Sequence, residues 1–170
     1  MADVLLIIAE QNFRDEELFH TKEEMEKNKI SAVIASKTSG EKSGSLGGKA
    51  KAEIALKDVK INDYKAVVFV GGSGSKQYFE DPEALEIAKK AYEKGKIVAA
   101  ICIAPVILAN AGILKGKKAT VHHGNEQELE KKGANYINQN VVKDGKIITA
   151  CGPSAAREFG NTIAKEIKNV

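Results

Sequence analysis

One stretch of this sequence decides its fold: Val98-Ala99-Ala100-Ile101-Cys102-Ile103-Ala104-Pro105. An apolar run of strand-forming residues ends at Cys102, and Pro105 suits the first turn of a following helix, where its missing N–H costs nothing. We therefore expect a strand-to-helix corner at Cys102. Because such corners lie at the carboxyl end of an open α/β sheet, where ligands bind, the thiol is placed to react.

Two interpretations of Cys102 follow from its position. The partial positive charge of a helix N-terminus favours thiolate over thiol, so a reactive cysteine here should have a pKa below the ordinary value of about 8.5. A tight corner would also hold the nucleophile clear of its neighbours. The alternative is a buried structural cysteine, since free cysteine is among the most buried residue types.

Strand and helix patterns alternate on both sides of this corner. Strands are expected at 4–9, 31–36, 66–70 and 118–121, and helices at 15–28, 82–95 and 126–132. A Gly/Ser-rich stretch at 39–48 precedes short strands around 52–56, Asp144-Gly145 turns a hairpin over 141–150, and Ser154 caps a last helix. This order predicts a three-layer α/β/α sandwich with a mainly parallel, flavodoxin-like sheet, forming one domain over 1–170.

Composition excludes several classes of function. The 170 residues carry a net charge of only +3, with acids and bases interspersed, which argues against a nucleic-acid or membrane surface. No apolar run reaches the roughly 18 residues that span a bilayer. The first nine residues fit a strand rather than a signal peptide, and two cysteines make no disulfide framework. We expect a cytoplasmic protein.

A glycine-rich turn, Gly71-Gly72-Ser73-Gly74-Ser75, directly follows the expected central strand. Glycine lets a backbone N–H approach a ligand oxygen closely, as an oxyanion hole requires, and the N–H of Ile103 would be the second donor. A flexible turn is the simpler interpretation. A phosphate loop is disfavoured because neither G-x-x-x-x-G-K-[ST] nor G-x-G-x-x-G occurs.

Three acids, Asp15, Glu16 and Glu17, open the first helix. Acids at this place usually complement the helix dipole, and for any one of them that is the simpler interpretation. The preceding loop, however, also opens at the carboxyl end of the sheet. One acid turned inward would have its pKa raised by burial and could donate a hydrogen bond to a thiolate.

Histidines are few, and His122 and His123 are adjacent after the short strand at 118–121. One of them could reach Cys102 as a base. Adjacent residues of an extended segment face opposite ways, so at most one should point at the thiol. His20 is expected at the surface or in packing, and Cys151 is expected to be structural. Cysteine and histidine do not cluster at ligand spacing, so no metal or cofactor is implied.

These pieces together resemble the DJ-1/PfpI family of the class I glutamine amidotransferase-like superfamily. The resemblance covers essentially the whole chain. It is carried by Phe13-Arg14-Asp15-Glu16-Glu17-Leu18, Val70-Gly71-Gly72, Ala99-Ala100-Ile101-Cys102 with Pro105, the His122 segment, Asp144-Gly145 and Gly152-Pro153.

The resemblance implies roles for five residues. Cys102 matches the family's nucleophilic, oxidation-sensitive cysteine, and Glu17 matches the glutamate that hydrogen-bonds it. Gly72 and Ile103 match the oxyanion-hole amides. His122 matches the histidine near the cysteine in DJ-1-like members. A homodimer or higher homo-oligomer is the family's habit.

Two positions depart from the PfpI-type peptidases. Ile103 stands where they carry a histidine after the cysteine, and Lys76 stands where a neighbouring subunit offers a glutamate. The peptidase dyad is therefore missing, and an intracellular peptidase is the least favoured activity.

Two functions remain nearly level. One is covalent cysteine catalysis on a small reactive carbonyl or its protein adduct, of glyoxalase, deglycase or hydrolase type. The other is a non-catalytic sensor or chaperone of oxidative stress that works through oxidation of Cys102. A flavodoxin-like nucleotide-binding module suits the topology but lacks a phosphate motif.

Overall fold

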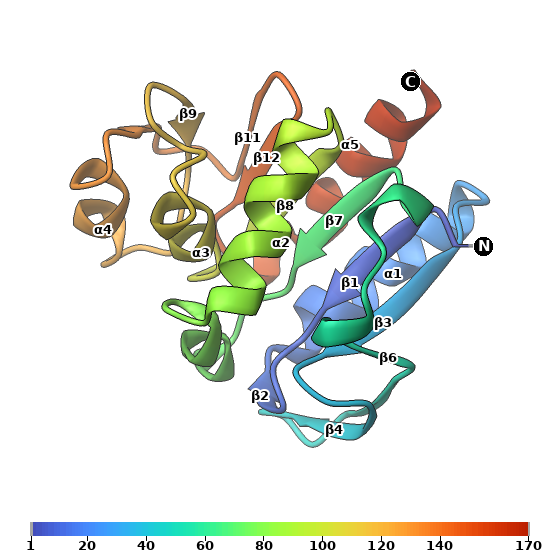
Figure 1. Cartoon of the computed structure of the whole chain (residues 1–170). Helices are drawn as coiled ribbons and strands as arrows, with labels where there is room; N and C mark the ends of the chain where they lie inside the picture. The colour runs from blue at the N-terminus through green and yellow to red at the C-terminus, as the bar shows by residue number, and fades with distance from the viewer. Residues whose placement is uncertain (1, 170) are drawn as a thin grey trace.

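A seven-stranded sheet forms the middle layer of the protein, whose computed structural model describes residues 2–169 (Figure 1). Its strands in chain order are β1 (Val4–Ile7), β3 (Ala32–Ser36), β6 (Ile54–Ala55), β7 (Ala66–Phe69), β8 (Ile97–Ile101), β11 (Val141–Asp144) and β12 (Ile147–Ala150). In space they run β11-β12-β8-β7-β1-β3-β6, and only β11 is antiparallel to its neighbour. The prediction of a mainly parallel sheet is confirmed.

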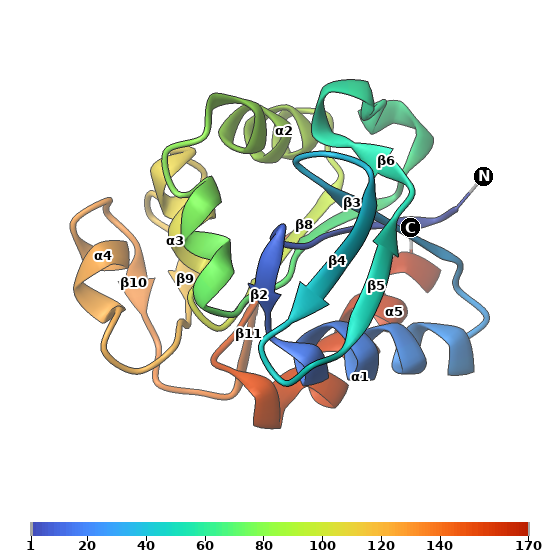
Figure 2. The same ribbon diagram turned by 90° about the horizontal axis from the view of Figure 1, so that it is seen from below.

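Helices cover both faces of this sheet (Figure 2). On one face lie α1 (Asp15–Lys27) and α5 (Ala156–Lys168), and on the other α2 (Pro82–Glu93) and α3 (Pro105–Asn110). Side chains of a strand point alternately to its two faces, so Val68 joins the core beneath α1 and α5, whereas Val67 joins the core beneath α2 and α3. Strands β1, β7 and β8 are buried throughout, which explains their unbroken apolar sequences.

Two small sheets lie at the periphery. One contains β2 (Gln11–Phe13), β4 (Gly40–Gly44) and β5 (Lys49–Ala52), so the Gly/Ser-rich stretch forms a hairpin. The other pairs β9 (Lys118–Ala119) with β10 (Asn135–Tyr136), and α4 (Glu126–Glu130) lies between these two strands in the chain. Strand β2 was not predicted, because its exposed Gln11 and the positive φ of Asn12 (61°) give no strand pattern.

Four short 3₁₀ helices occur in the described connections, at Leu56–Asp58, Ile61–Asp63, Ser73–Tyr78 and Pro153–Ala155. The last of these makes one capping prediction wrong. Ser154 lies inside the 3₁₀ turn and makes no cap hydrogen bond, and α5 begins only at Ala156. By contrast, Asp81 caps α2 as predicted, accepting a bond from the N–H of Glu83 at 2.9 Å.

Within residues 2–169, no helix is both long enough and apolar enough to span a membrane.

Candidate active site

Cys102 directly follows β8 at a sharp corner. Its φ of 67° is left-handed, a conformation uncommon for a residue with a side chain. Backbone hydrogen bonds hold it from both sides: its N–H donates to Ala150 O at 2.9 Å, and its carbonyl accepts from the N–H of His122 at 2.7 Å. The residue is only 8% exposed. The predicted strand-to-helix corner is therefore present, and it is fixed by two other segments.

The three acids at the start of α1 point in three directions. Glu17 is completely buried, and the polar groups that face its carboxyl are the Cys102 thiol and the Gly71 N–H. Neither carboxyl oxygen makes a hydrogen bond of normal geometry within the described chain. Glu16 instead accepts a two-pronged bond from the Arg14 guanidinium, at 2.9 and 3.1 Å. The acid that the family resemblance singled out is thus the one beside the thiol.

Asp15, the third acid, is buried toward the β4–β5 hairpin. Its Oδ1 accepts the N–H of Leu46 at 2.9 Å and its Oδ2 the N–H of Gly48 at 2.7 Å. The tip of the hairpin is therefore tied to the same helical turn that carries Glu17. Ser45, at this tip, lines the pocket above the thiol.

Burial raises the pKa of Glu17 to about 8, because a carboxylate without water or a strong donor is costly. The facing Cys102 thiol, the positive charge of Arg14 and the Gly71 N–H lower the pKa only in part. At neutral pH the carboxyl is therefore mostly protonated. The sequence predicts that an acid turned inward has its pKa raised by burial, and Glu17 agrees with that prediction.

The prediction of a lowered pKa for Cys102 is wrong. Burial, and after it the charge of an ionised Glu17, raises the pKa of the thiol. The backbone N–H groups of Gly72 and Ile103 act in the opposite direction. Helix α3 has only six residues, and its terminal field does not outweigh these effects. The thiol and the carboxyl form a buried pair in which an ionised partner disfavours ionisation of the other.

The glycine turn after β7 is built against this pair. A side chain at Gly71 would collide with Ile101 O at 2.5 Å and with Cys102 Cβ at 2.6 Å, so only glycine fits. The Gly71 carbonyl accepts the N–H of Arg14 at 2.9 Å. Since the C=O and N–H of one trans peptide point opposite ways, this bond directs the N–H of Gly72 toward the sulfur.

A pocket of about 510 Å³ opens over Cys102. His122 and His123 both line it, but both are exposed, and His123 Nδ1 lies 3.5 Å from Glu126 Oε2. Two charged residues that line the pocket, Arg14 and Lys76, were not predicted as site residues. Their signal was present, because Arg14 precedes the acids of α1 and Lys76 occupies the position of the peptidase glutamate.

Other candidate residues lie outside this pocket. His20 is half-buried on α1, and Cys151 places its Sγ 3.7 Å from Asn140 Oδ1. Among the described residues, no three His, Cys, Asp or Glu side chains come close enough together to hold a metal ion.

Comparison with known proteins identifies the family. The model of the DJ-1/PfpI family matches residues 2–166. This chain belongs to the DJ-1/PfpI family. An uncharacterized protein of Methanocaldococcus jannaschii is 48% identical over 98% of this chain and 83% of its own length. A protein of Pyrococcus furiosus named deglycase PfpI is 31% identical over 96% of this chain and 99% of its own.

Solved structures agree with this assignment. The ThiJ/PfpI domain protein from Brachyspira murdochii superposes with a TM-score of 0.97 at 33% identity, covering 99% of this chain and 97% of that one. Other relatives in sequence have the names glyoxalase and isonitrile hydratase. The family and the fold are thus those predicted from the sequence, and the relatives' names support activity of the DJ-1/PfpI type in general.

Proposed function

We propose that this protein is a cysteine-dependent enzyme acting on small reactive carbonyl compounds or their protein adducts. One observation carries the proposal. Glu17 is fully buried, lacks a hydrogen-bond partner of normal geometry, and faces the thiol of Cys102 at the base of an open pocket. A buried carboxyl without a hydrogen-bond partner lowers the stability of the fold. Such costly groups cluster at functional sites, and beside a cysteine the carboxyl can act in proton transfer.

The first step follows from the state of the buried pair. When the pair loses one proton, with the pKa of Glu17 at about 8, the remaining proton lies mainly on the sulfur, because burial raises the pKa of the thiol above that of the carboxyl. Transfer of that proton from the thiol to the Glu17 carboxylate gives the Cys102 thiolate, which adds to an aldehyde carbon. A C–S bond forms, the C=O π bond breaks, and its electron pair moves to oxygen. The N–H groups of Gly72 and Ile103 stabilise that oxyanion.

Glu17 then moves a proton within the adduct of a 2-oxoaldehyde. Its acid form first protonates the oxyanion, which leaves a hydroxyl on the former aldehyde carbon and a carboxylate on Glu17. That carboxylate removes the C–H proton from the same carbon and returns it to the neighbouring carbonyl carbon, while the hydroxyl proton passes to the neighbouring oxygen. The product is a thioester of a 2-hydroxy acid on Cys102. Water attacks the thioester, the C–S bond breaks, and the hydroxy acid and free thiol are released. In the net reaction the 2-oxoaldehyde and one water give the 2-hydroxy acid, with no external oxidant or reductant.

Two observations support this proposal over peptide hydrolysis. The relatives named deglycase span nearly the whole chain, and one further relative is named a glyoxalase. The peptidase positions, by contrast, hold Ile103 and Lys76, which supply no imidazole and no carboxylate. His122 remains a candidate general base, since it lines the pocket.

A sensor function is the second candidate, favoured by the protonated state of Glu17 at neutral pH. Peroxide would transfer an oxygen to the Cys102 sulfur, breaking its O–O bond and leaving water, and a second equivalent would give the sulfinic acid. A carboxylic acid beside the sulfur can donate a hydrogen bond to either product.

The test combines two measurements on the wild type, Cys102→Ala and Cys151→Ser. Consumption of methylglyoxal and formation of lactate report turnover, and intact mass after sub-stoichiometric peroxide reports oxidation. Turnover that is lost only in Cys102→Ala supports the enzyme. Selective oxidation of Cys102 without turnover supports the sensor. If the wild type shows neither, both candidates fail.

A further inference from the structure

The charges around the mouth of the pocket are unbalanced. Among the described residues that line it, none is an aspartate or a glutamate, whereas Arg14 and Lys76 both line it. We propose that the substrate carries a carboxylate, held by the ammonium group of Lys76 while Cys102 attacks its carbonyl carbon. This inference rests on the proposed function, because it names the class of carbonyl substrate that the same pocket takes.

Lys76 is held at the rim by a fixed turn. It lies in the 3₁₀ segment Ser73–Tyr78, which begins immediately after Gly72. The Gly72 carbonyl accepts both the N–H and the hydroxyl of Ser75, at 3.0 and 2.7 Å. The backbone that carries Lys76 is therefore tied to the residue whose N–H faces the sulfur. The backbone at Lys76 is thus fixed beside the pocket, and the exposed side chain carries its charge from that point.

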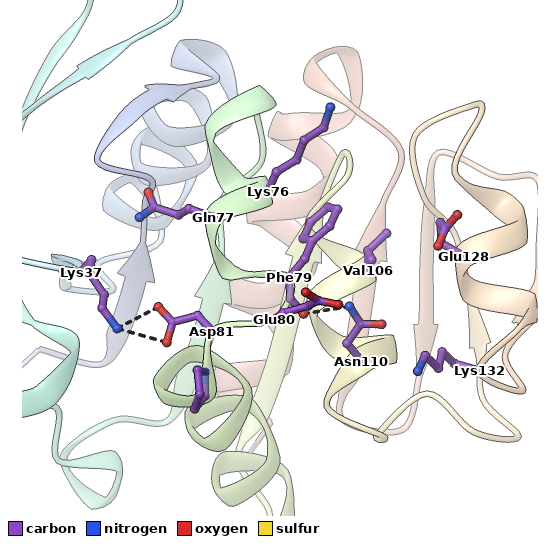
Figure 3. A pocket seen from close by; sticks show the side chains of 11 residues that line it. Lys37, Lys76, Gln77, Phe79, Glu80, Asp81, Val106, Asn110, Glu128 and Lys132 are labelled. Atoms are coloured by element: carbon purple, nitrogen blue, oxygen red, sulfur yellow. Dashed lines mark hydrogen bonds and ion pairs between the residues drawn. The ribbon is translucent and has the colours of Figure 1, made fainter.

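Asp81, one of the two acids nearest to Lys76 along the chain, is engaged elsewhere. A second hollow, of about 790 Å³, lies on the other side of the 3₁₀ segment, and Lys76 lines both hollows. There Asp81 pairs with Lys37, with an Nζ–Oδ2 distance of 2.8 Å. Figure 3 shows the amino group of Lys76 pointing away from Asp81 and Glu80. Lys76 makes no ion pair within residues 2–169, so its charge is available to a ligand.

Arg14 differs, because its charge is already matched. Both prongs of its guanidinium bind the two oxygens of Glu16, and its side chain is 38% exposed. Only one lysine or arginine in the described lining thus lacks a carboxylate partner. One free positive charge matches a monoanion, which favours a carboxylate over a phosphate dianion. The expected substrate class is therefore a small 2-oxoaldehyde that also carries a carboxylate, such as 4,5-dioxopentanoate.

The experiment compares two reagents that differ only in charge. Iodoacetate carries a carboxylate and iodoacetamide a neutral amide, and with either one the sulfur of Cys102 displaces iodide as the C–S bond forms. Rates are measured at Cys102 by peptide mass in a Cys151→Ser background, at low salt. The ratio of the two rates cancels the intrinsic reactivity of the thiol and leaves the effect of the reagent's charge.

We expect Lys76→Glu to lower the iodoacetate-to-iodoacetamide ratio about tenfold and Lys76→Met to lower it about threefold, since a partly exposed charge pair is weakened by solvent. Addition of about 0.5 M salt should bring the wild-type ratio close to that of Lys76→Met. The matched control is Lys89→Glu, which reverses an exposed lysine of α2 away from the pocket and should leave the ratio unchanged.

Equal ratios in Lys76→Glu and Lys89→Glu would overturn the inference. If the ratio depends on Lys76 but the protein turns over neither 4,5-dioxopentanoate nor methylglyoxal, the anion site is supported and the proposed function is refuted. If methylglyoxal is turned over but the ratio does not depend on Lys76, the proposed function is supported and the anion site is refuted. If neither reagent modifies Cys102, the pocket does not admit ligands to the sulfur and both proposals fall.

Discussion

Cys102 and Cys151 follow neighbouring parallel strands at the same edge of the sheet. Ile101 and Ala150, the residues before them, are register partners on β8 and β12. Yet Cys102 has a left-handed backbone and faces a buried acid, whereas Cys151 is half-buried with its sulfur near an amide oxygen. The comparison teaches that the carboxyl edge of a sheet does not by itself make a site. The neighbouring glycine turn and the acid beneath it distinguish the two corners.

The largest expected difference between these corners is catalytic. Cys102→Ala should reduce carbonyl turnover by at least about 10³-fold, because covalent catalysis needs its sulfur. Cys151→Ser should stay within about twofold of the wild type. Steady-state kinetics with methylglyoxal measure both. Equal losses in the two variants would show that the corners are not functionally distinct.

Glu17 gives the Cys102 corner a cost in stability that the Cys151 corner lacks. Its pKa is about 8 in the folded chain against an ordinary value of 4.5. The unfolded chain therefore loses this proton first, so stability is highest below pH 4.5 and falls as pH rises through about 8. Glu17→Gln stays neutral and should be more stable than the wild type by about 4 kcal/mol at pH 8.

Urea unfolding at pH 4.5 and pH 8 measures this difference. Glu16→Gln is the control, because its carboxyl is partly exposed and paired with Arg14. We expect the Glu16→Gln variant to gain no stability relative to the wild type between pH 4.5 and pH 8. A Glu17→Gln variant whose advantage over the wild type does not grow between the two pH values would contradict the burial argument.

Glycines near the two corners provide the next contrast. A Cβ at Gly71 would lie 2.5 Å from Ile101 O and 2.6 Å from Cys102 Cβ, and it would also meet the Glu17 carboxyl. Gly71→Ala should therefore destabilise the protein by about 2–3 kcal/mol. At Gly152 the same atom meets only His122 Cδ2, at 3.8 Å. Gly152→Ala should cost less than about 0.5 kcal/mol in the same denaturant series.

Asp15 supports only the Cys102 side, through the tip of the β4–β5 hairpin. Asp15→Asn replaces one of its two accepting oxygens by a donor, so one bond to Leu46 or Gly48 is lost, at about 1 kcal/mol. Thermal unfolding measures this cost, and faster amide exchange at those two residues should accompany it. Asp58→Asn, at an exposed acid, is the control. Unchanged exchange at the hairpin would refute the anchoring role of Asp15.

Local signals predicted the elements that depend on local chemistry. Asp81-Pro82 starts α2 as expected, and Asp144-Gly145 turns the β11–β12 hairpin, with Gly145 at a φ of 61°. The prediction that Ser154 caps the last helix was wrong, because a serine before an apolar helical sequence can lie inside a 3₁₀ turn as easily as at a helix cap. Strand β2 was missed because its pairing with β4 is set by tertiary contacts and not by its own polar sequence.

The site shows the same division. Sequence alone offered three acids without choosing among them, and the resemblance chose Glu17. The direction of the Cys102 pKa could not be predicted, because it depends on how much burial outweighs two backbone amides. The sequence singled out Lys76 only as the position of a missing glutamate, and its place beside the pocket came from the fold.

The positive φ of Cys102 has a consequence for transplanting this corner into another protein. The conformation is clamped by Ala150 on one side and His122 on the other, residues 48 and 20 positions further along the chain. A graft of residues 98–105 into a foreign sheet would import the local sequence without either clamp. Cys102 would relax there into an ordinary helical or extended backbone conformation, so a designer must copy three separate segments to place its sulfur in the same way.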